Sequence, residues 1–225
     1  MQIHNTPDRW GAVQQTLHWL IVALAVVQIG AGFYMGGFPP DEIGRLSAFS
    51  LHATLGLTIL VLMLARLAWR MSNPVPLMPE RLGPPERALV RLTHYGFYVL
   101  LIVLPITGYL MASARGYPIT FYGLNVPRLV GPDETLATAF FYGHFVGVAL
   151  TVLSLALHVA GALRHEFILR DNTLRRMTSL PPREGDYAAR TTRLPSASER
   201  VGGRALETDA RGVRRPGPRR VDGGP

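Results

Sequence analysis

The chain has 225 residues, of which 48% are hydrophobic and only 17% are charged. Soluble domains carry charge on about a quarter of their residues, so this composition excludes an ordinary soluble protein. All 23 basic residues are Arg, and with 15 acidic residues they give a formal net charge of +8. Cys is absent, which excludes disulfides, iron–sulfur ligation and thiol catalysis.

Four stretches of the chain are almost free of charge, and each has the roughly 20 residues that a helix needs to cross about 30 Å of hydrocarbon. They are apolar all round and lack the alternation of barrel strands. A secretory signal is the alternative for the first stretch, but no small-x-small cleavage site follows it. The sequence therefore predicts an all-α integral membrane four-helix bundle, with spans at residues 16–35, 49–69, 92–112 and 138–163.

The Arg residues near the helix ends predict the orientation, because cytoplasmic loops hold the positive excess. One side of the membrane has ten of them and the other has three, which predicts that both termini are cytoplasmic. The loop at residues 73–85 contains five Pro and is expected to be an ordered, extended connection. The loop at residues 113–135 is long enough to form a lid over the mouth of the bundle.

The chain changes character at about Thr178 and becomes rich in Arg, Pro, Gly and Ser. Such a segment buries too little apolar surface to offset its ordering entropy. We therefore expect a membrane domain at residues 1–177 and a disordered cytoplasmic tail at residues 178–225. The tail contains ten Arg and six acidic residues, so it either contacts anionic lipid headgroups or is simply solvated.

Histidines inside the predicted spans are the main functional signal, since ionisable residues there are costly and usually functional. His144 and His158 are fourteen residues apart, which brings them within about 40° of one helix face and separates them by about 21 Å. His18 lies at the same depth as His158, and His52 at the same depth as His144. The sequence predicts two bis-imidazole sites stacked across the membrane, as a pair of b-type haems requires. Both haems would be non-covalent, because no Cys is present to attach them.

Other residues fall into register with these ligands. Arg66 lies fourteen residues after His52, where a haem propionate would pair with its charge. Four glycines on the ligand faces leave room for a flat macrocycle, namely Gly32, Gly56, Gly147 and Gly161. The alternatives are plain interhelical hydrogen bonds and helix packing, or a zinc or proton transporter. A transporter would use membrane Asp or Glu, which these spans lack.

The chain resembles the bacterial cytochrome b561 family, four-helix dihaem membrane cytochromes that exchange electrons with quinone. The likeness covers about residues 8–178 and is carried by Leu17-His18-Trp19-Leu20, His52 to Gly56, Leu62-Met63-Leu64-Ala65-Arg66-Leu67, Leu104-Pro105-Ile106-Thr107-Gly108, His158 to His165 and Arg170-Asp171-Asn172-Thr173-Leu174-Arg175-Arg176-Met177. The resemblance implies axial ligation by His18, His52, His144 and His158. It leaves His94 open as an alternative ligand, a quinone partner or a structural donor, and we favour an interface role for both His94 and His165.

The resemblance implies a protein of the bacterial inner membrane that moves electrons between a quinone pool and a redox partner protein or small oxidant. Proteins similar to this family are linked to superoxide oxidation with ubiquinone as the acceptor. A b-type anchor subunit of a multi-subunit dehydrogenase or hydrogenase is the alternative, although the short first outer loop offers little docking surface. A haem-free bundle is the non-redox alternative.

Overall fold

The computed structural model describes residues 2–37, 43–78, 82–178, 180–181, 206–208 and 214–216. The chain divides into two units, Met1–Leu180 and Pro181–Pro225. Most of the tail at residues 178–225, which we expect to be disordered, lies outside the described residues. Within it, β3 (Leu206–Thr208) pairs antiparallel with β4 (Arg214–Pro216).

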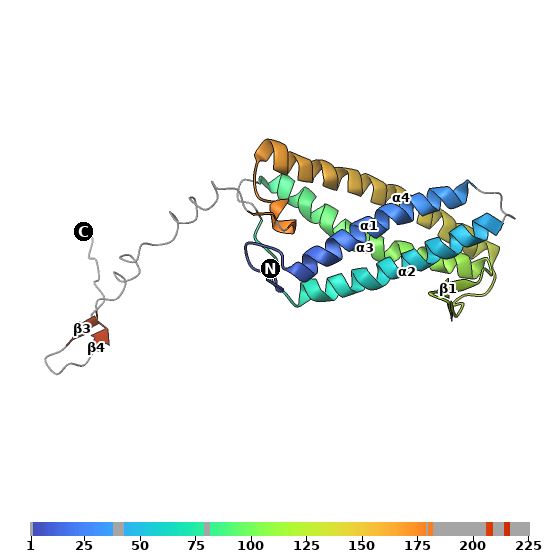
Figure 1. Ribbon diagram of the computed structural model, residues 1–225, viewed down its shortest axis with the longest axis horizontal. Coiled ribbons are helices and arrows are strands. Elements are labelled where there is room, and N and C mark those ends of the chain that lie inside the picture. The colour runs from blue at the N-terminus through green and yellow to red at the C-terminus, as the bar shows by residue number, and fades with distance from the viewer. Residues whose placement is uncertain are drawn as a thin grey trace, which may run out of the picture. The chain divides into compact units, whose positions relative to one another are not determined.

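Four long helices make up the first unit and lie side by side (Figure 1). All four are long and apolar enough to cross a membrane, and each contains one of the spans expected from the sequence. The prediction of a four-helix membrane protein is therefore confirmed. The helices are α1 (Ala12–Gly36), α2 (Ile43–Met71), α3 (Pro84–Ala114) and α4 (Glu134–Leu163).

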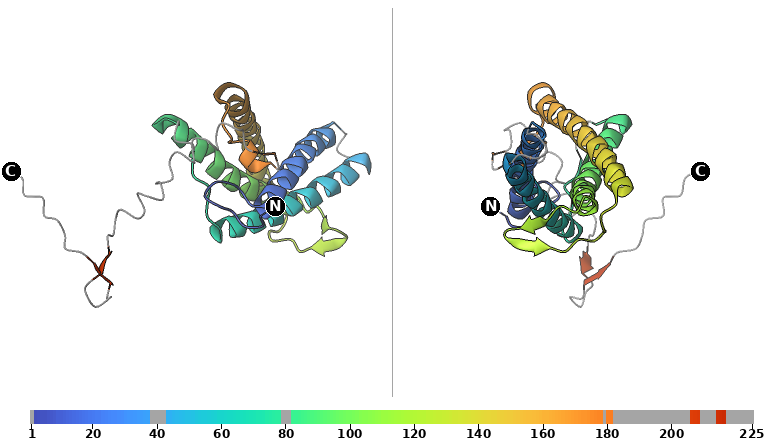
Figure 2. Two further views of the ribbon diagram at one scale, coloured as in Figure 1. Left: turned by 60° about the vertical axis from the view of Figure 1, so that its left-hand side comes forward. Right: turned by 90° about the vertical axis from the view of Figure 1, so that its right-hand side faces the viewer.

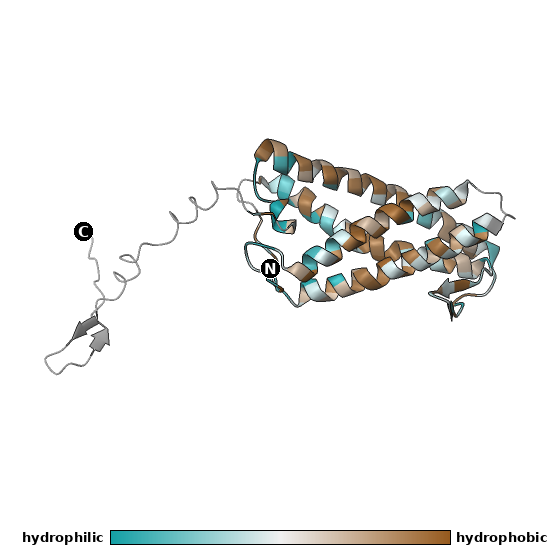
Figure 3. Ribbon diagram, in the orientation of Figure 1, coloured by the Kyte–Doolittle hydropathy of each residue, from teal (hydrophilic) through white to brown (hydrophobic). Residues whose placement is uncertain are grey.

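The four long helices consist largely of hydrophobic residues (Figure 3). Large hydrophobic side chains such as Val26, Val103 and Leu153 are about half exposed, at 57%, 46% and 55%. A soluble protein rarely exposes so much contiguous apolar surface, whereas lipid chains cover it without cost. In a bilayer, acyl chains therefore cover the helix surface that water would contact in a soluble bundle.

Local sequence signals position the helix starts. Pro84 begins α3, where its missing N–H needs no partner, and the Glu86 side chain accepts a hydrogen bond from the Gly83 N–H at 3.0 Å. Asp133 caps α4 by accepting from the Leu136 N–H at 3.0 Å. The described part of the proline-rich loop before α3 is neither helix nor strand.

A short hairpin follows α3, within the loop at residues 113–135 that is long enough to form a lid, and it lies against α2. β1 (Ile119–Phe121) pairs antiparallel with β2 (Leu124–Val126). Its turn residues Tyr122 and Gly123 have φ values of 48° and 83°, which is the left-handed pair that tight hairpin turns require. The sequence analysis does not predict these strands. We call this end of the bundle the hairpin end.

The opposite end, here called the Arg-rich end, contains the start of α1 and the residues that follow α4. After α4 the chain forms a π-helix, η1 (Arg164–Leu169), and a 3₁₀ turn, η2 (Arg175–Met177). The returning segment docks on α1, where the Trp19 indole N–H donates to the Met177 carbonyl at 2.8 Å. The Arg176 guanidinium donates to the Leu77 carbonyl at 2.7 Å. These bonds hold three separate parts of the chain together at this end.

Candidate functional site

The four histidines within the spans form two pairs, and α4 contributes one member to each. His18 and His158 lie at the Arg-rich end, with ring centroids 6.3 Å apart and ring planes at 72°. His52 and His144 lie at the hairpin end, with centroids 6.4 Å apart and planes at 72°. This is the pairing that helix depth predicts.

The separation within each pair fits two axial ligands of one metal atom. A metal–imidazole bond is about 2 Å, and the ligating nitrogen lies roughly 1.1 Å from its ring centre, so trans ligands place their centroids about 6.2 Å apart. The observed 6.3 and 6.4 Å agree with this value. Among the described residues, no group of three or more His, Cys, Asp or Glu could hold a metal ion. Two ligands on opposite faces are what the iron of a b-type haem needs from the protein.

His94 lies next to the His18–His158 pair at the Arg-rich end. Its ring centroid is only 5.4 Å from that of His158, with the planes at 89°. Its Nδ1 is 2.6 Å from the Val90 carbonyl one turn earlier in α3. This separation is too short for trans ligation with His158, so the geometry favours a neighbouring role for His94.

The backbone of α3 orients His144. Its Nδ1 lies 3.1 Å from the Leu104 carbonyl and 3.2 Å from the Thr107 hydroxyl. The Thr107 hydroxyl itself donates to the Leu104 carbonyl at 2.9 Å. An Nδ1–H that donates to Leu104 leaves Nε2 as the ligating nitrogen, and such bonds fix the ring orientation of metal-binding histidines.

Two glycines make room for the rings at the hairpin end. A Cβ at Gly32 would lie 3.2 Å from Cε1 of His52, and a Cβ at Gly108 would lie 3.0 Å from Cε1 of His144. Gly108 belongs to a stretch that carries the family resemblance, but the sequence analysis does not assign it a role. Its contact depends on the rotation of α3 against α4, which the sequence does not reveal.

The other three candidate glycines differ in their surroundings. A Cβ at Gly56 would lie 3.1 Å from the amide nitrogen of Gln28, and one at Gly147 would lie 2.8 Å from the Leu104 side chain. Both therefore allow close helix packing beside the ligands. A Cβ at Gly161 would meet no described atom within 4 Å, which leaves open space next to His158.

We expect Gly108→Ala to weaken haem binding at the hairpin end, because the added methyl displaces the His144 ring. Gly96→Ala in the same helix is the matched control, since its Cβ would meet no described atom within 4 Å. Alanine in a helix interior otherwise stabilises by about 0.5–1 kcal/mol over glycine. Haem content and the α-band spectrum of the purified variants are the measurement, and equal haem content in both variants would contradict the prediction.

Arg66 contacts one of the paired histidines directly. Its guanidinium donates from Nη1 to Nδ1 of His18 at 2.9 Å. A histidine that ligates iron through Nε2 carries its proton on Nδ1, so this nitrogen can then no longer accept from Arg66. If His18 ligates iron, the Arg66 guanidinium therefore needs an acceptor other than Nδ1 of His18.

Several donors of α2 and α3 are buried and lack a hydrogen-bond partner among the described residues. They are Nε of Arg66, Nε1 of Trp69 and the hydroxyl of Tyr98. Gln14, one turn before His18, is completely buried and both atoms of its amide also lack a partner. Unsatisfied polar groups cost several kcal/mol in a membrane interior, roughly. Buried donors suit the carboxylates of haem propionates, and only the tertiary structure shows that Gln14, Trp69 and Tyr98 have buried polar atoms without partners.

Comparison with known proteins agrees with this geometry. The family model described as prokaryotic cytochrome b561 matches residues 9–180. The chain belongs to the prokaryotic cytochrome b561 family. It is 32% identical to cytochrome b561 homolog 2 of Escherichia coli K12 over 79% of this chain and 95% of that protein. It is 28% identical to the probable superoxide oxidase CybB of Yersinia pestis, over 79% and 98% of the two chains.

Membership of the cytochrome b561 family makes the protein a multi-pass bacterial membrane cytochrome that uses b-type haem. The family match ends at residue 180, which is also where the first unit ends. The tail therefore lies outside the part of the chain that the family describes.

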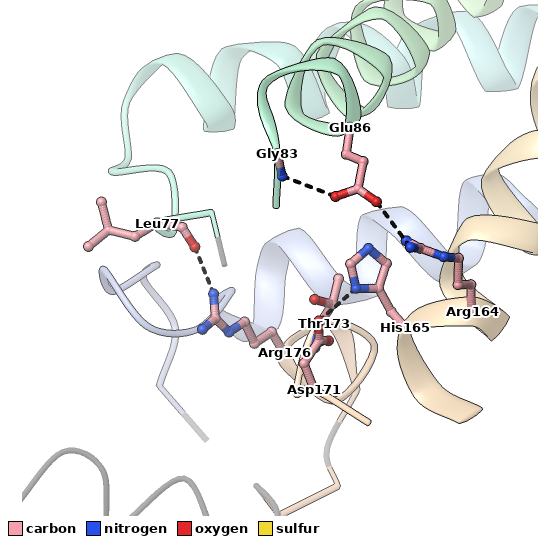
Figure 4. Close-up of polar contacts among 8 residues, drawn as sticks. All are labelled: Leu77, Gly83, Glu86, Arg164, His165, Asp171, Thr173 and Arg176. Atoms are coloured by element: carbon pink, nitrogen blue, oxygen red, sulfur yellow. Dashed lines mark hydrogen bonds and ion pairs between the residues drawn. The ribbon is translucent and has the colours of Figure 1, made fainter. Parts of the chain in front are cut away.

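A second polar cluster of this cytochrome lies at the Arg-rich end (Figure 4). His165, in η1, is 7% exposed and its Nδ1 lies 2.7 Å from Oδ2 of Asp171. Burial by itself raises the pKa of the Asp171 carboxyl. Hydrogen bonds from Thr173 and His165 lower this pKa by a larger amount, so the net shift is downward. The carboxylate is ionised at neutral pH and fixes the His165 proton on Nδ1. Arg164, the residue before His165, forms an exposed ion pair with Glu86 at 3.0 Å.

Proposed function

We propose that this cytochrome binds two non-covalent b-type haems, one between His18 and His158 and one between His52 and His144. The observation that supports this proposal is the pair of ring separations, 6.3 and 6.4 Å. The iron of a bound haem supplies reversible one-electron transfer. The protein holds the ligand rings, keeps water away from them and sets the charge around them.

The ratio of haem to protein tests this proposal. A pyridine haemochrome assay against protein mass should give two haems for each chain. Acid acetone should extract all the pigment, because no Cys is present to attach it. One haem or none for each chain, in protein that retains its fold, would overturn the two-site arrangement.

The two sites lie near opposite ends of the bundle, so the proposed function is electron transfer across the membrane. We place the Arg-rich end in the cytoplasm of a bacterial cell, in the inner membrane, because its loops hold most of the Arg near the spans. Both termini are then cytoplasmic, and the hairpin faces the outside.

We propose ubiquinone as the electron partner at the Arg-rich end. Quinone reduction consumes protons as well as electrons, and the His165–Asp171 pair is suited to deliver them. Asp171 accepts from Nδ1–H of His165, so the proton that the imidazolium form carries on Nε2 is the one that the ring can donate to a quinone oxygen, after which Nε2 takes up a proton from water. Figure 4 shows this second nitrogen turned away from Asp171, on the side of Glu86 and Arg164.

His165→Gln should slow the oxidation of reduced haem by a short-chain ubiquinone without changing haem content. A general acid typically contributes about 10²- to 10⁴-fold, so a fall of at least about tenfold is expected. Stopped-flow decay of the reduced α-band is the measurement. Arg164→Gln is the control, because it removes only the exposed pair with Glu86. Equal rates in both variants would mean that His165 does not serve the quinone.

At the hairpin end, we propose superoxide or a redox partner protein as the electron partner. A relative of this chain is named probable superoxide oxidase CybB, which favours superoxide. The outer loop contains Arg115 and Arg128, and an anion would be drawn toward such charges. The Arg115 guanidinium lies over the Phe141 ring at 5.6 Å, which holds its charge near the mouth of the bundle.

A further inference from the structure

Three hydroxyl residues form a ladder along α2, at Ser50, Thr54 and Thr58. Their spacing of four residues puts them on one helix face. At 100° per residue, this face is roughly opposite the face of His52. His52 points toward the haem site, so the ladder lies on the outside of the bundle.

The hairpin covers this ladder. The Thr54 hydroxyl donates to the Thr120 carbonyl at 3.2 Å, and the hydroxyls of Ser50 and Thr120 are 3.3 Å apart. The Tyr122 hydroxyl lies 3.0 Å from that of Thr58. Because Thr58 already donates to the Thr54 carbonyl at 2.8 Å, Tyr122 is the donor in this contact.

The tip of the hairpin reaches the depth of the membrane span. Thr58 lies six residues beyond His52 on α2, which is about 9 Å further from the hairpin end. It is also at the centre of the span Gly44–Met71. The Tyr122 hydroxyl therefore lies deeper than the haem ligand His52. Figure 2 shows the hairpin outside the four helices, alongside α2.

The exposed side chains at the tip of the hairpin are apolar, whereas the exposed Asn125 lies beside Thr120, nearer to the hairpin end. Ile119 is 4% exposed and faces the bundle, whereas Tyr122 and Leu124 are 68% and 71% exposed. Backbone groups at this depth need partners. The β1–β2 ladder supplies partners between the strands, and the Thr54 hydroxyl satisfies an edge carbonyl.

We propose that the hairpin Ile119–Val126 lies in the lipid leaflet at the hairpin end, with Tyr122 and Leu124 in contact with acyl chains. The neighbouring helix α2 also exposes apolar side chains, such as Leu51 at 54% and Val61 at 56%. Lipid therefore fits the surface better than water or a second polypeptide does. The Tyr122–Thr58 bond fastens the tip and holds the outer loop next to the His52–His144 pair.

The chain has no Cys, so single cysteines report local environment cleanly. We would introduce Leu124→Cys into the full haem-loaded protein in nanodiscs of phosphatidylethanolamine and phosphatidylglycerol, and add a membrane-impermeant maleimide. Only a hydrated thiolate reacts quickly, so labelling should be at least about tenfold slower than at Leu129→Cys. Leu129 is 71% exposed in the same loop but outside the hairpin, and Val103→Cys on the surface of α3 is the lipid-facing control.

A benzophenone attached to Leu124→Cys then identifies the neighbour by mass spectrometry after photolysis. A phospholipid adduct is the expected product. Labelling as fast as at Leu129→Cys, or crosslinking to another polypeptide, would overturn the proposal. Adding Thr58→Val should speed maleimide labelling of Leu124→Cys, and Thr58→Ser should restore slow labelling. An unchanged rate in Thr58→Val would show that the Tyr122 bond does not hold the tip in lipid.

Discussion

Replacing His144 with Ala should remove the haem at the hairpin end and leave the haem at the Arg-rich end in place. His158→Ala should do the opposite. In the proposed arrangement each change deletes one of the two histidines that would hold one haem, so haem content should fall from two to about one for each chain. The two histidines are about 21 Å apart along α4, so neither change reaches the other site directly.

The partner histidines make this prediction specific. His52→Ala should reproduce the spectral loss of His144→Ala, because their rings face each other at 6.4 Å. His18→Ala should reproduce that of His158→Ala, because those rings face each other at 6.3 Å. Low-temperature α-band spectra of the four variants are the measurement. Matching losses in His18→Ala and His144→Ala would show that the pairing is wrong.

Arg66→Gln should lower the midpoint potential of the haem at the Arg-rich end and leave the other potential unchanged. The guanidinium is positively charged and lies against His18, so it favours the reduced haem, whose net charge is more negative. A charge interaction of about 1–2 kcal/mol corresponds to a fall of roughly 40–90 mV for a one-electron couple. Glutamine keeps hydrogen-bonding capacity while it removes the charge.

Potentiometric titration of the two haems measures this effect. Tyr98→Phe is the matched control, because it removes a neighbouring buried donor without changing the net charge. The alternative is that Arg66 extends toward the headgroups and helps to set topology. Unchanged potentials with full haem content in Arg66→Gln would support that alternative.

The sequence alone determined the four spans and the depth of each span histidine. Bilayer thickness fixes how long an apolar helix must be, and a constant rise for each residue converts sequence position into depth. The pairing of His18 with His158 and of His52 with His144 follows from these two rules. Depth also places His94 at the level of His18 and His158, and only the tertiary structure shows that its ring lies 5.4 Å from that of His158.

Only the tertiary structure decided what each helix face meets. The sequence places Gly147 on the ligand face of α4, but the Leu104 side chain of α3 fills the space beside it. Gly108 faces His144. Its own helix, α3, contributes no histidine to either pair, so residue spacing along α3 could not place Gly108 beside one. The rotation of one helix against another depends on side-chain packing across the interface, which periodicity within one helix does not encode.

Contacts that depend on how turns close were equally beyond the sequence. The hairpin lies on α2 because Thr58 and Thr54 reach Tyr122 and Thr120, more than sixty residues away. Asp171 reaches His165 because η1 and the left-handed Arg170, at a φ of 50°, reverse the chain. Both contacts depend on how turns close in three dimensions, whereas the helix spans and the histidine depths depend only on distance along the chain.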